Sequence, residues 1–255
     1  MAKSLGKANR EVCNVKILDY ANKAPICDFK YANTTGLSIT SDSVYAMAHG
    51  TRKIAFNNPL EGTITITAQV LPIELYALYS DGIIDTSASY YTSATIACAT
   101  AGELPLTVSS GTIVAGSIFV YPEGEYGKTP IAGTFAEGKF TATTASEIAV
   151  GNKYEVGFMI SRSTGVQKIT LNNSRVPKDV TICMDTFDKN ESGQWVPIRI
   201  NVLKATIQRN LELSFSSEGD PQEVTLTFDI LEKDKDNFVE YIELTEEIEV
   251  NPATT

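Results

Sequence analysis

The stretch TSDSVYAMAHGTRKIAFNNPLEGTITITAQVLPIELYALYSDG, residues Thr40–Gly82, contains three successive patterns from which the fold can be predicted. Its first part, Ser41–Phe56, is polar and rich in small residues, and it lacks a periodic apolar face. We therefore predict an extended arm that is disordered or mobile in the monomer. An arm of this kind beside elements with clear apolar faces indicates assembly rather than catalysis.

The second and third patterns predict a strand and a short helix. Thr63–Val70 alternates threonine with apolar residues at period two, which indicates one polar and one buried face. Pro72 fits the first turn of a helix, and Gly82 can supply its left-handed C-terminal residue. Because this helix is short, packing has to hold it. We expect it to cap one open end of a β-sandwich.

Alternating segments on both sides of this stretch predict further strands. Cys13–Leu18 and Cys27–Tyr31 precede it, and the residues Asn33–Gly36 that follow them predict a turn. From Asp179 onward the alternation is stronger and predicts an antiparallel sheet with a polar turn at Asp188–Gly193. The acidic end from residue 237 is expected to fray. The strands expected in this sheet are Val180–Met184, Ile198–Val202, Leu211–Phe215 and Val224–Ile230.

Residues 86–175 differ in composition from the rest of the chain. They are rich in Thr, Ser, Ala and Gly, carry few charges, and show turn signals at short spacing. We predict a β-rich elaboration or inserted subdomain at 86–175, with the core formed by 1–85 and 176–255. The short strands expected in it are Ile113–Val114, Ser117–Tyr121, Lys139–Thr143, Tyr154–Ile160 and Lys168–Leu171. The fold class is therefore mainly β, with antiparallel sheets and one short flanking α-helix.

Composition argues against several functions. The 255 residues carry a formal net charge of -10, whereas a nucleic-acid-binding groove needs clustered Lys and Arg. The four cysteines are widely spaced and His49 is the single histidine, so a zinc site has no support. We expect the cysteines to be reduced, small and mostly buried. The N-terminus lacks a signal-peptide pattern and no long apolar run exists, which favours a soluble protein made in the cytoplasm.

No motif assembles a catalytic site. A Ser/His/Asp triad would have to use His49, which has no nucleophile elbow near it, and phosphate-binding glycine loops are missing. We therefore expect no enzyme activity and no cofactor. Trp195 follows a polar turn, where it either packs at the end of a strand or offers a platform for a sugar ring.

Two segments together resemble the tail tube proteins of long-tailed bacteriophages. The first is VYAMAHGTRKIAFNNPLEGTITITAQVLPIELYALYS, residues Val44–Ser80, in which a long loop leads into a strand and a short helix. The second is Thr181–Leu231, with a strand entry at Lys204, Ala205 and Asn210 and a Gly-Asp-Pro turn before the last long strand. The order and spacing of these features carry the resemblance.

The resemblance implies an antiparallel β-sandwich that forms a barrel with its neighbours. Six copies would join edge to edge into a ring, and stacked rings would make a hollow tube through which DNA leaves the capsid. It implies further tail proteins as partners, namely tape measure, terminator and distal tail proteins, and DNA that passes without specific binding. It implies no membrane partner and a place in the virion tail after synthesis in the host cytoplasm.

Two sets of residues are candidates for assembly. The inter-ring arm would use Asp42, Tyr45, Met47, His49, Arg52, Lys53 and Phe56. Residues 211–255 hold 13 acidic and 2 basic side chains, whereas residues 1–30 hold 6 basic and 3 acidic ones, so the two ends could attract each other between subunits. Acidic candidates for the lumen or for inter-ring contacts are Glu212, Glu218, Asp220, Asp229, Asp234 and Asp236.

An alternative function is a surface or secreted β-sandwich module that binds carbohydrate through Trp195 and nearby tyrosines. Self-association separates the two functions, because a tube subunit forms rings or tubes without ligand, whereas a carbohydrate-binding module stays monomeric.

Overall fold

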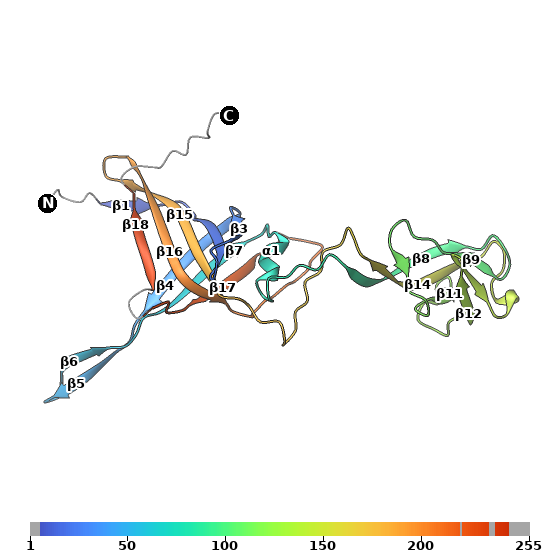
Figure 1. Cartoon of the computed structure of the whole chain (residues 1–255), viewed down its shortest axis with the longest axis horizontal. Coiled ribbons are helices and arrows are strands. Elements are labelled where there is room, and N and C mark those ends of the chain that lie inside the picture. The colour runs from blue at the N-terminus through green and yellow to red at the C-terminus, as the bar shows by residue number, and fades with distance from the viewer. Residues whose placement is uncertain (1–5, 220, 235–237, 245–255) are drawn as a thin grey trace. The chain divides into compact units, whose positions relative to one another are not determined.

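The structure is a computed structural model of the chain, and it describes residues 6–219, 221–234 and 238–244. The fold is mainly β, with 52% strand and 3% helix, so the predicted fold class is confirmed. The chain divides into two compact units, Met1–Ile83 with Thr170–Thr255, and Ile84–Ile169 (Figure 1). Within the described residues the sheets are antiparallel, and none of them closes into a barrel.

The first unit is built on one sheet of nine strands in which every pairing is antiparallel. Seven strands follow one another across it, while β1 (Lys7–Asn9) pairs with β15 and β18 (Val239–Glu243) pairs with β16. The seven are, in order, β3 (Pro25–Phe29), β2 (Asn14–Asp19), β15 (Val180–Asn190), β16 (Trp195–Ile207), β17 (Val224–Ile230), β7 (Glu61–Ala68) and β4 (Ala32–Thr40).

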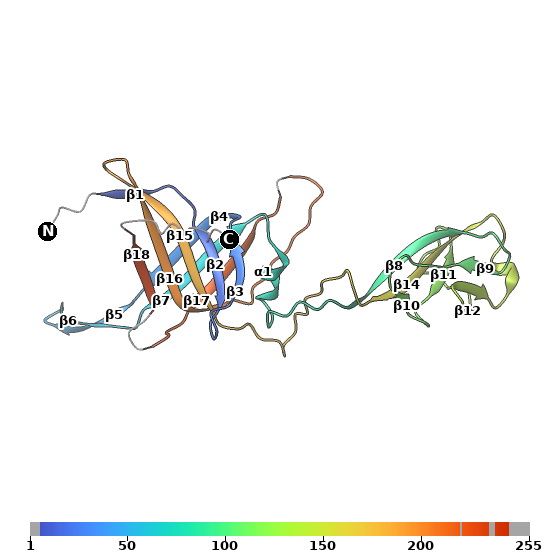
Figure 2. The same ribbon diagram turned by 45° about the horizontal axis from the view of Figure 1, so that its top comes forward.

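This sheet doubles over on itself at β16. Residues Ile198–Val202 of that strand pair with β18, and Ala205–Ile207 pair with β17, so β16 passes from one layer into the other. Figures 1 and 2 show β15 and β16 crossing β4, β7 and β17. The two layers share one core, and the backbone N–H of Cys13 donates to Thr35 Oγ1 across them at 3.2 Å. The fully buried members of this core include Val15, Ile17, Ile64, Ile66, Ile182, Met184, Leu226 and Phe228.

Helix α1 (Ile73–Ala77) lies against the core of the first unit, as the sequence predicts. Pro72 precedes it, and the N–H of Gly82 (φ +79°) donates to Ala77 O at 3.1 Å, which ends the helical turns. Leu75 is fully buried in the core cluster. Truncating such a side chain to alanine costs about 2–5 kcal/mol, so packing is what holds this five-residue helix.

Three sequence-based predictions for this unit are wrong. Asn33–Gly36, expected as a turn, lies inside β4, because pairing with β7 outweighs the local turn preference. Leu211–Phe215, expected as a strand, has no strand partner, and Phe215 is 92% exposed. The end expected to fray contains β18, where Val239 and Tyr241 alternate opposite Val202 and Ile200, while its last part, 245–255, lies outside the described residues.

The second unit contains two smaller sheets. In the first, β14 (Lys153–Arg162) pairs with β8 (Ala88–Ala97) on one side and with β11 (Phe119–Pro122) and β10 (Thr112–Ile113) on the other. The second has the order β12 (Gly133–Ala136), β13 (Lys139–Ala142) and β9 (Glu103–Pro105), and a 3-10 turn, Ala145–Glu147, follows β13. Their shared core includes Leu104, Val120, Phe140, Ile148, Tyr154, Val156 and Phe158.

Four of the five short strands expected in this region coincide with strands, but Lys168–Leu171 does not. There, Lys168 forms only an isolated bridge with Asp85. Strand β8 was not expected, although all ten of its residues pair with β14. It lies at a sheet edge and has no fully buried residue, so its sequence carries no clear alternation.

Candidate assembly surfaces

Residues 43–57 form a β-hairpin that projects from the first unit (Figure 1). Strand β5 (Ser43–Ala48) pairs with β6 (Thr51–Asn57), so the extended arm expected here is a hairpin of paired strands rather than a disordered segment. The turn explains the difference, because His49 and Gly50 both have positive φ, 51° and 78°, as the two-residue hairpin turn requires. At the base, the N–H of Asn58 donates to Asp42 O at 2.9 Å.

Cross-strand pairing gives the hairpin an apolar face. Val44 pairs with Phe56 and Ala46 pairs with Ile54, so these four side chains lie on the same side. Val44, Ile54 and Phe56 are 59%, 56% and 59% exposed. A lone two-stranded hairpin is marginally stable, and contiguous exposed apolar side chains mark a surface that associates.

The other arm candidates also lie on this hairpin or at its base. The Arg52 guanidinium lies 4.3 Å from the centre of the Tyr45 ring, in cation–π contact. Met47 is 60% exposed, and Lys53 is exposed next to the register shift at Ala46/Met47. His49 occupies the turn. The structure therefore places all seven predicted arm residues together: Asp42, Tyr45, Met47, His49, Arg52, Lys53 and Phe56.

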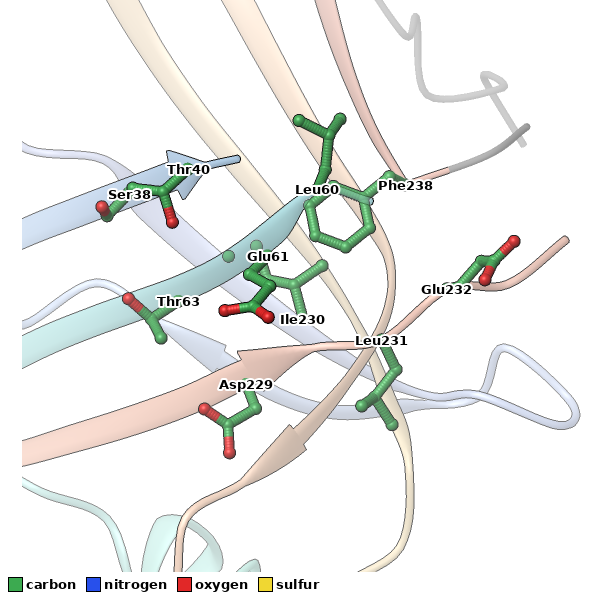
Figure 3. A pocket seen from close by; sticks show the side chains of 11 residues that line it. Ser38, Thr40, Leu60, Glu61, Thr63, Asp229, Ile230, Leu231, Glu232 and Phe238 are labelled. Atoms are coloured by element: carbon green, nitrogen blue, oxygen red, sulfur yellow. The ribbon is translucent and has the colours of Figure 1, made fainter. Parts of the chain in front are cut away.

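A hollow of about 380 Å³ lies where β7 begins and β17 ends, at the base of the hairpin (Figure 3). Ile230 and Phe238 close over Gly62, where an added Cβ would lie 2.9 Å and 3.1 Å from their nearest carbons. Leu60, at the rim, is 54% exposed. None of the residues that line this hollow is Lys or Arg. Apart from Leu231, the remaining lining residues carry a hydroxyl or a carboxylate: Ser38, Thr40, Glu61, Thr63, Asp229 and Glu232.

The two outward faces of the doubled sheet differ in charge. On β4, β7 and β17 the residues that alternate with the buried ones are mostly threonine and serine, with Glu61 and Asp229. None of these three strands contains Lys or Arg. On the other layer, Lys16 Nζ and Arg199 Nε bind the same carboxylate of Asp185 at 2.6 Å and 3.0 Å.

The acidic candidates do not gather at one site. Glu212 and Glu218 are exposed in the segment between β16 and β17, and Asp234 is exposed beyond β17. Asp229 is half-buried and accepts a hydrogen bond from Gln208 Nε2 at 2.7 Å. Asp220 and Asp236 lie outside the described residues.

One contact between the basic N-terminal and acidic C-terminal parts lies within a single chain. Lys7 Nζ forms an ion pair with Glu243 of β18. From the sequence we expect such an attraction only between subunits. This pair was missed because β18, which carries Glu243, was not expected.

The cysteines and the single Trp offer no reactive site. All four cysteines are free, Cys98 is buried and the others are half-buried. Burial raises the pKa of the Cys27 and Cys183 thiols above the ordinary 9.0, so both stay neutral at pH 7. Trp195 is 55% exposed, with Lys189 Nζ 5.5 Å from its ring centre. Within the described residues no group of three or more His, Cys, Asp or Glu could hold a metal ion.

A family model matches residues 9–244 of this chain, which include both halves of the sheet, the hairpin and the second unit. The chain belongs to the YomU/Tube protein family. The resemblance to phage tail tube proteins is thereby confirmed, and the chain is a structural protein of the virion tail. A search of the curated proteins found no match. Among the helices of the described residues, none is long and apolar enough to cross a membrane.

Proposed function

We propose that this member of the family is the ring-forming subunit of the tail tube, that six copies make each ring, and that stacked rings form the conduit for DNA ejection. The observation that carries the proposal is the hairpin β5–β6. It exposes a set of large apolar side chains on a projecting element, and within the described part of the chain nothing covers them. Stacking of rings would bury them.

Ring closure would use the free edges of the sheet. Among the described strands, β3 and β4 end the strand order and β18 is paired on one side only. Exposed edges invite further pairing, and a closed ring satisfies them without unlimited growth within its plane. Growth along the axis then depends on the hairpin, because head-to-tail contacts repeat without closing.

The lumen wall is assigned to the face of β4, β7 and β17. A wall of hydroxyls and a few carboxylates cannot release counterions from the phosphate backbone, so DNA would slide past it. Asp229 belongs to this wall. Glu212, Glu218 and Asp234 are exposed and are assigned to contacts between rings. Tape measure, terminator and distal tail proteins would meet the tube inside and at its ends.

The test replaces Ser43–Asn57 with Gly-Gly, which leaves the bond from Asn58 N–H to Asp42 O inside a two-residue turn. We expect the shortened chain to fold with an unchanged thermal midpoint, because the hairpin contributes nothing to either core cluster, and its circular dichroism should change only by the loss of strands β5 and β6. Electron microscopy of the purified variant should show no long tubes.

A point variant and a matched control sharpen this test. Ile54→Asp should also prevent long tubes, since it puts a charge on the apolar face, whereas Val150→Asp, at a site 61% exposed in the second unit, should not. Both are surface changes and should alter the free energy of unfolding by no more than about 0.5 kcal/mol. Normal tubes from the Gly-Gly variant would contradict the stacking role.

A further inference from the structure

One sheet of the second unit has a face none of whose residues is assigned to the tube. On β14 the side chains of Tyr154, Val156 and Phe158 point into the core, so Glu155, Gly157 and Met159 lie on the opposite face. Their neighbours on this face are Tyr91, Ser93 and Thr95 of β8, and Phe119 and Tyr121 of β11.

Tyrosine rings stand over this face. The hydroxyls of Tyr91 and Tyr126 are hydrogen-bonded to each other above Gly157, and a Cβ at Gly157 would overlap both. The ring of Tyr126 also lies 5.1 Å from that of Tyr121, centre to centre. Tyr91 and Tyr126 are 52% and 46% exposed, so their apolar ring surfaces are held in place and still meet solvent. The missing side chain of Gly157 is what lets the pair sit there.

A hollow of about 230 Å³ opens beside Tyr126, lined by Ser93, Ala94, Thr95, Tyr126 and Glu155. Glu155 Oε2 is shielded from solvent and has no hydrogen-bond partner within the described residues. A shielded carboxylate oxygen without a donor is costly, and most such groups in folded proteins are satisfied. The hollow therefore presents an unpaired acceptor, Glu155 Oε2, together with the ring of Tyr126, and a ligand that donates a hydrogen bond would satisfy this acceptor.

We propose that this hollow binds a neutral carbohydrate. The C–H face of a sugar ring would pack on Tyr126, a sugar hydroxyl would donate to Glu155 Oε2, and the Ser93 and Thr95 hydroxyls would bond others. A concave site with an apolar wall and a few placed polar groups is the usual form of a small-ligand site. Its lining includes no Lys or Arg, so the Glu155 carboxylate disfavours acidic sugars and phosphates.

This activity is additional to the tube function. A single small ligand in an open hollow binds weakly, but many copies of the site along a tube would raise the avidity without any new contact. That increase rests on the proposed function, whereas binding by the isolated chain does not. A host-surface or environmental polysaccharide is the kind of polymer such an array would hold.

The experiment is saturation-transfer difference NMR on the purified full chain at millimolar sugar. The probes are glucose, galactose, mannose and N-acetylglucosamine, with N-acetylneuraminic acid as the acidic sugar. We expect at least one neutral sugar to bind and the acidic sugar not to bind. Glu155→Gln and Tyr126→Ala should each weaken binding about tenfold, because the first replaces a charged acceptor with a weaker neutral one and the second removes the ring on which the sugar packs.

Tyr90→Ala is the matched control, since Tyr90 neighbours Tyr91 on β8 but pairs opposite the buried Ile160, on the other face. It should bind as the unchanged chain does. Glu155→Gln keeps the shape of the side chain, so the test remains decisive if Tyr126→Ala folds poorly. Failure of every neutral sugar to bind, preference for the acidic sugar, or equal binding by Glu155→Gln and the unchanged chain would overturn the proposal. Tube formation by these variants reports separately on the proposed function.

Discussion

Tyr79 links helix α1 to the sheet of the first unit. It is 2% exposed, belongs to the core cluster, and its hydroxyl lies 3.5 Å from Thr225 O. Two causes raise the pKa of Tyr79 to about 12: burial, which has the larger effect, and the nearby Tyr76. The folded protein therefore keeps the phenol neutral at a pH where the unfolded chain has ionised it.

This shift predicts how the first unit responds to alkali. Below the ordinary pKa of 10.0, Tyr79 is neutral in both states and its contribution to folding is constant. As the pH rises from 10 towards 12, the unfolded chain releases the proton first, so the free energy of unfolding falls, by up to about 3 kcal/mol. Tyr79→Phe should lose this part of the pH dependence in urea titrations. Identical alkaline profiles for the two proteins would refute the assignment.

The burial of a single residue can be predicted from the sequence where the polarity of its side chain decides whether it faces the core or the solvent. Ile64 and Ile66 are fully buried, as the alternation predicts. Val70, expected on the same face, is 59% exposed, because β7 ends at Ala68. The contact of Tyr91 with Tyr126 could not be predicted, since it depends on a strand and a loop that only the folded sheet brings together.

At the scale of elements, two segments show opposite errors with one cause. Leu211–Phe215 alternates as a strand should but pairs with no strand, whereas Ser43–Asn57 lacks a clear pattern but forms a hairpin. In both segments the polarity pattern does not set backbone pairing, and in Leu211–Phe215 it does not set burial either, since Leu213 and Phe215 are 44% and 92% exposed. A hairpin exposed on both faces in the monomer has no buried face to record. Its turn, His49-Gly50, was the available signal, because both residues tolerate positive φ.

The second unit is proposed to be a peripheral elaboration that the tube does not need. Its base is defined by Asp85 and Lys168, whose backbones exchange hydrogen bonds of 2.9 Å and 2.8 Å. Replacing residues 86–167 with Gly-Gly keeps this pair in a two-residue turn. We expect the shortened chain to fold and to form tubes, seen by electron microscopy. A folded but non-assembling product, judged by circular dichroism, would show that the second unit takes part in the tube.

At the scale of the whole molecule, we predict that the charge of the proposed lumen wall decides whether the tube retains DNA. The double variant Thr65→Lys/Thr227→Lys places two cations on the outward face of β7 and β17, where the register pairs these residues. Tubes of this variant should retain short double-stranded DNA in co-sedimentation at low salt and release it as salt rises. Unchanged tubes, and tubes of a control with Asn201→Lys on the other layer, should not retain it. Equal retention of DNA by the control and the double variant would contradict the assignment of the lumen wall to the face of β4, β7 and β17.

We propose that this chain by itself builds a hollow tube. Negative-stain electron microscopy of the purified, unmodified chain over a rising range of protein concentration tests it most directly. We expect rings with six-fold symmetry that stack into hollow tubes without any ligand or partner. Particles that stay monomeric at every concentration would contradict it.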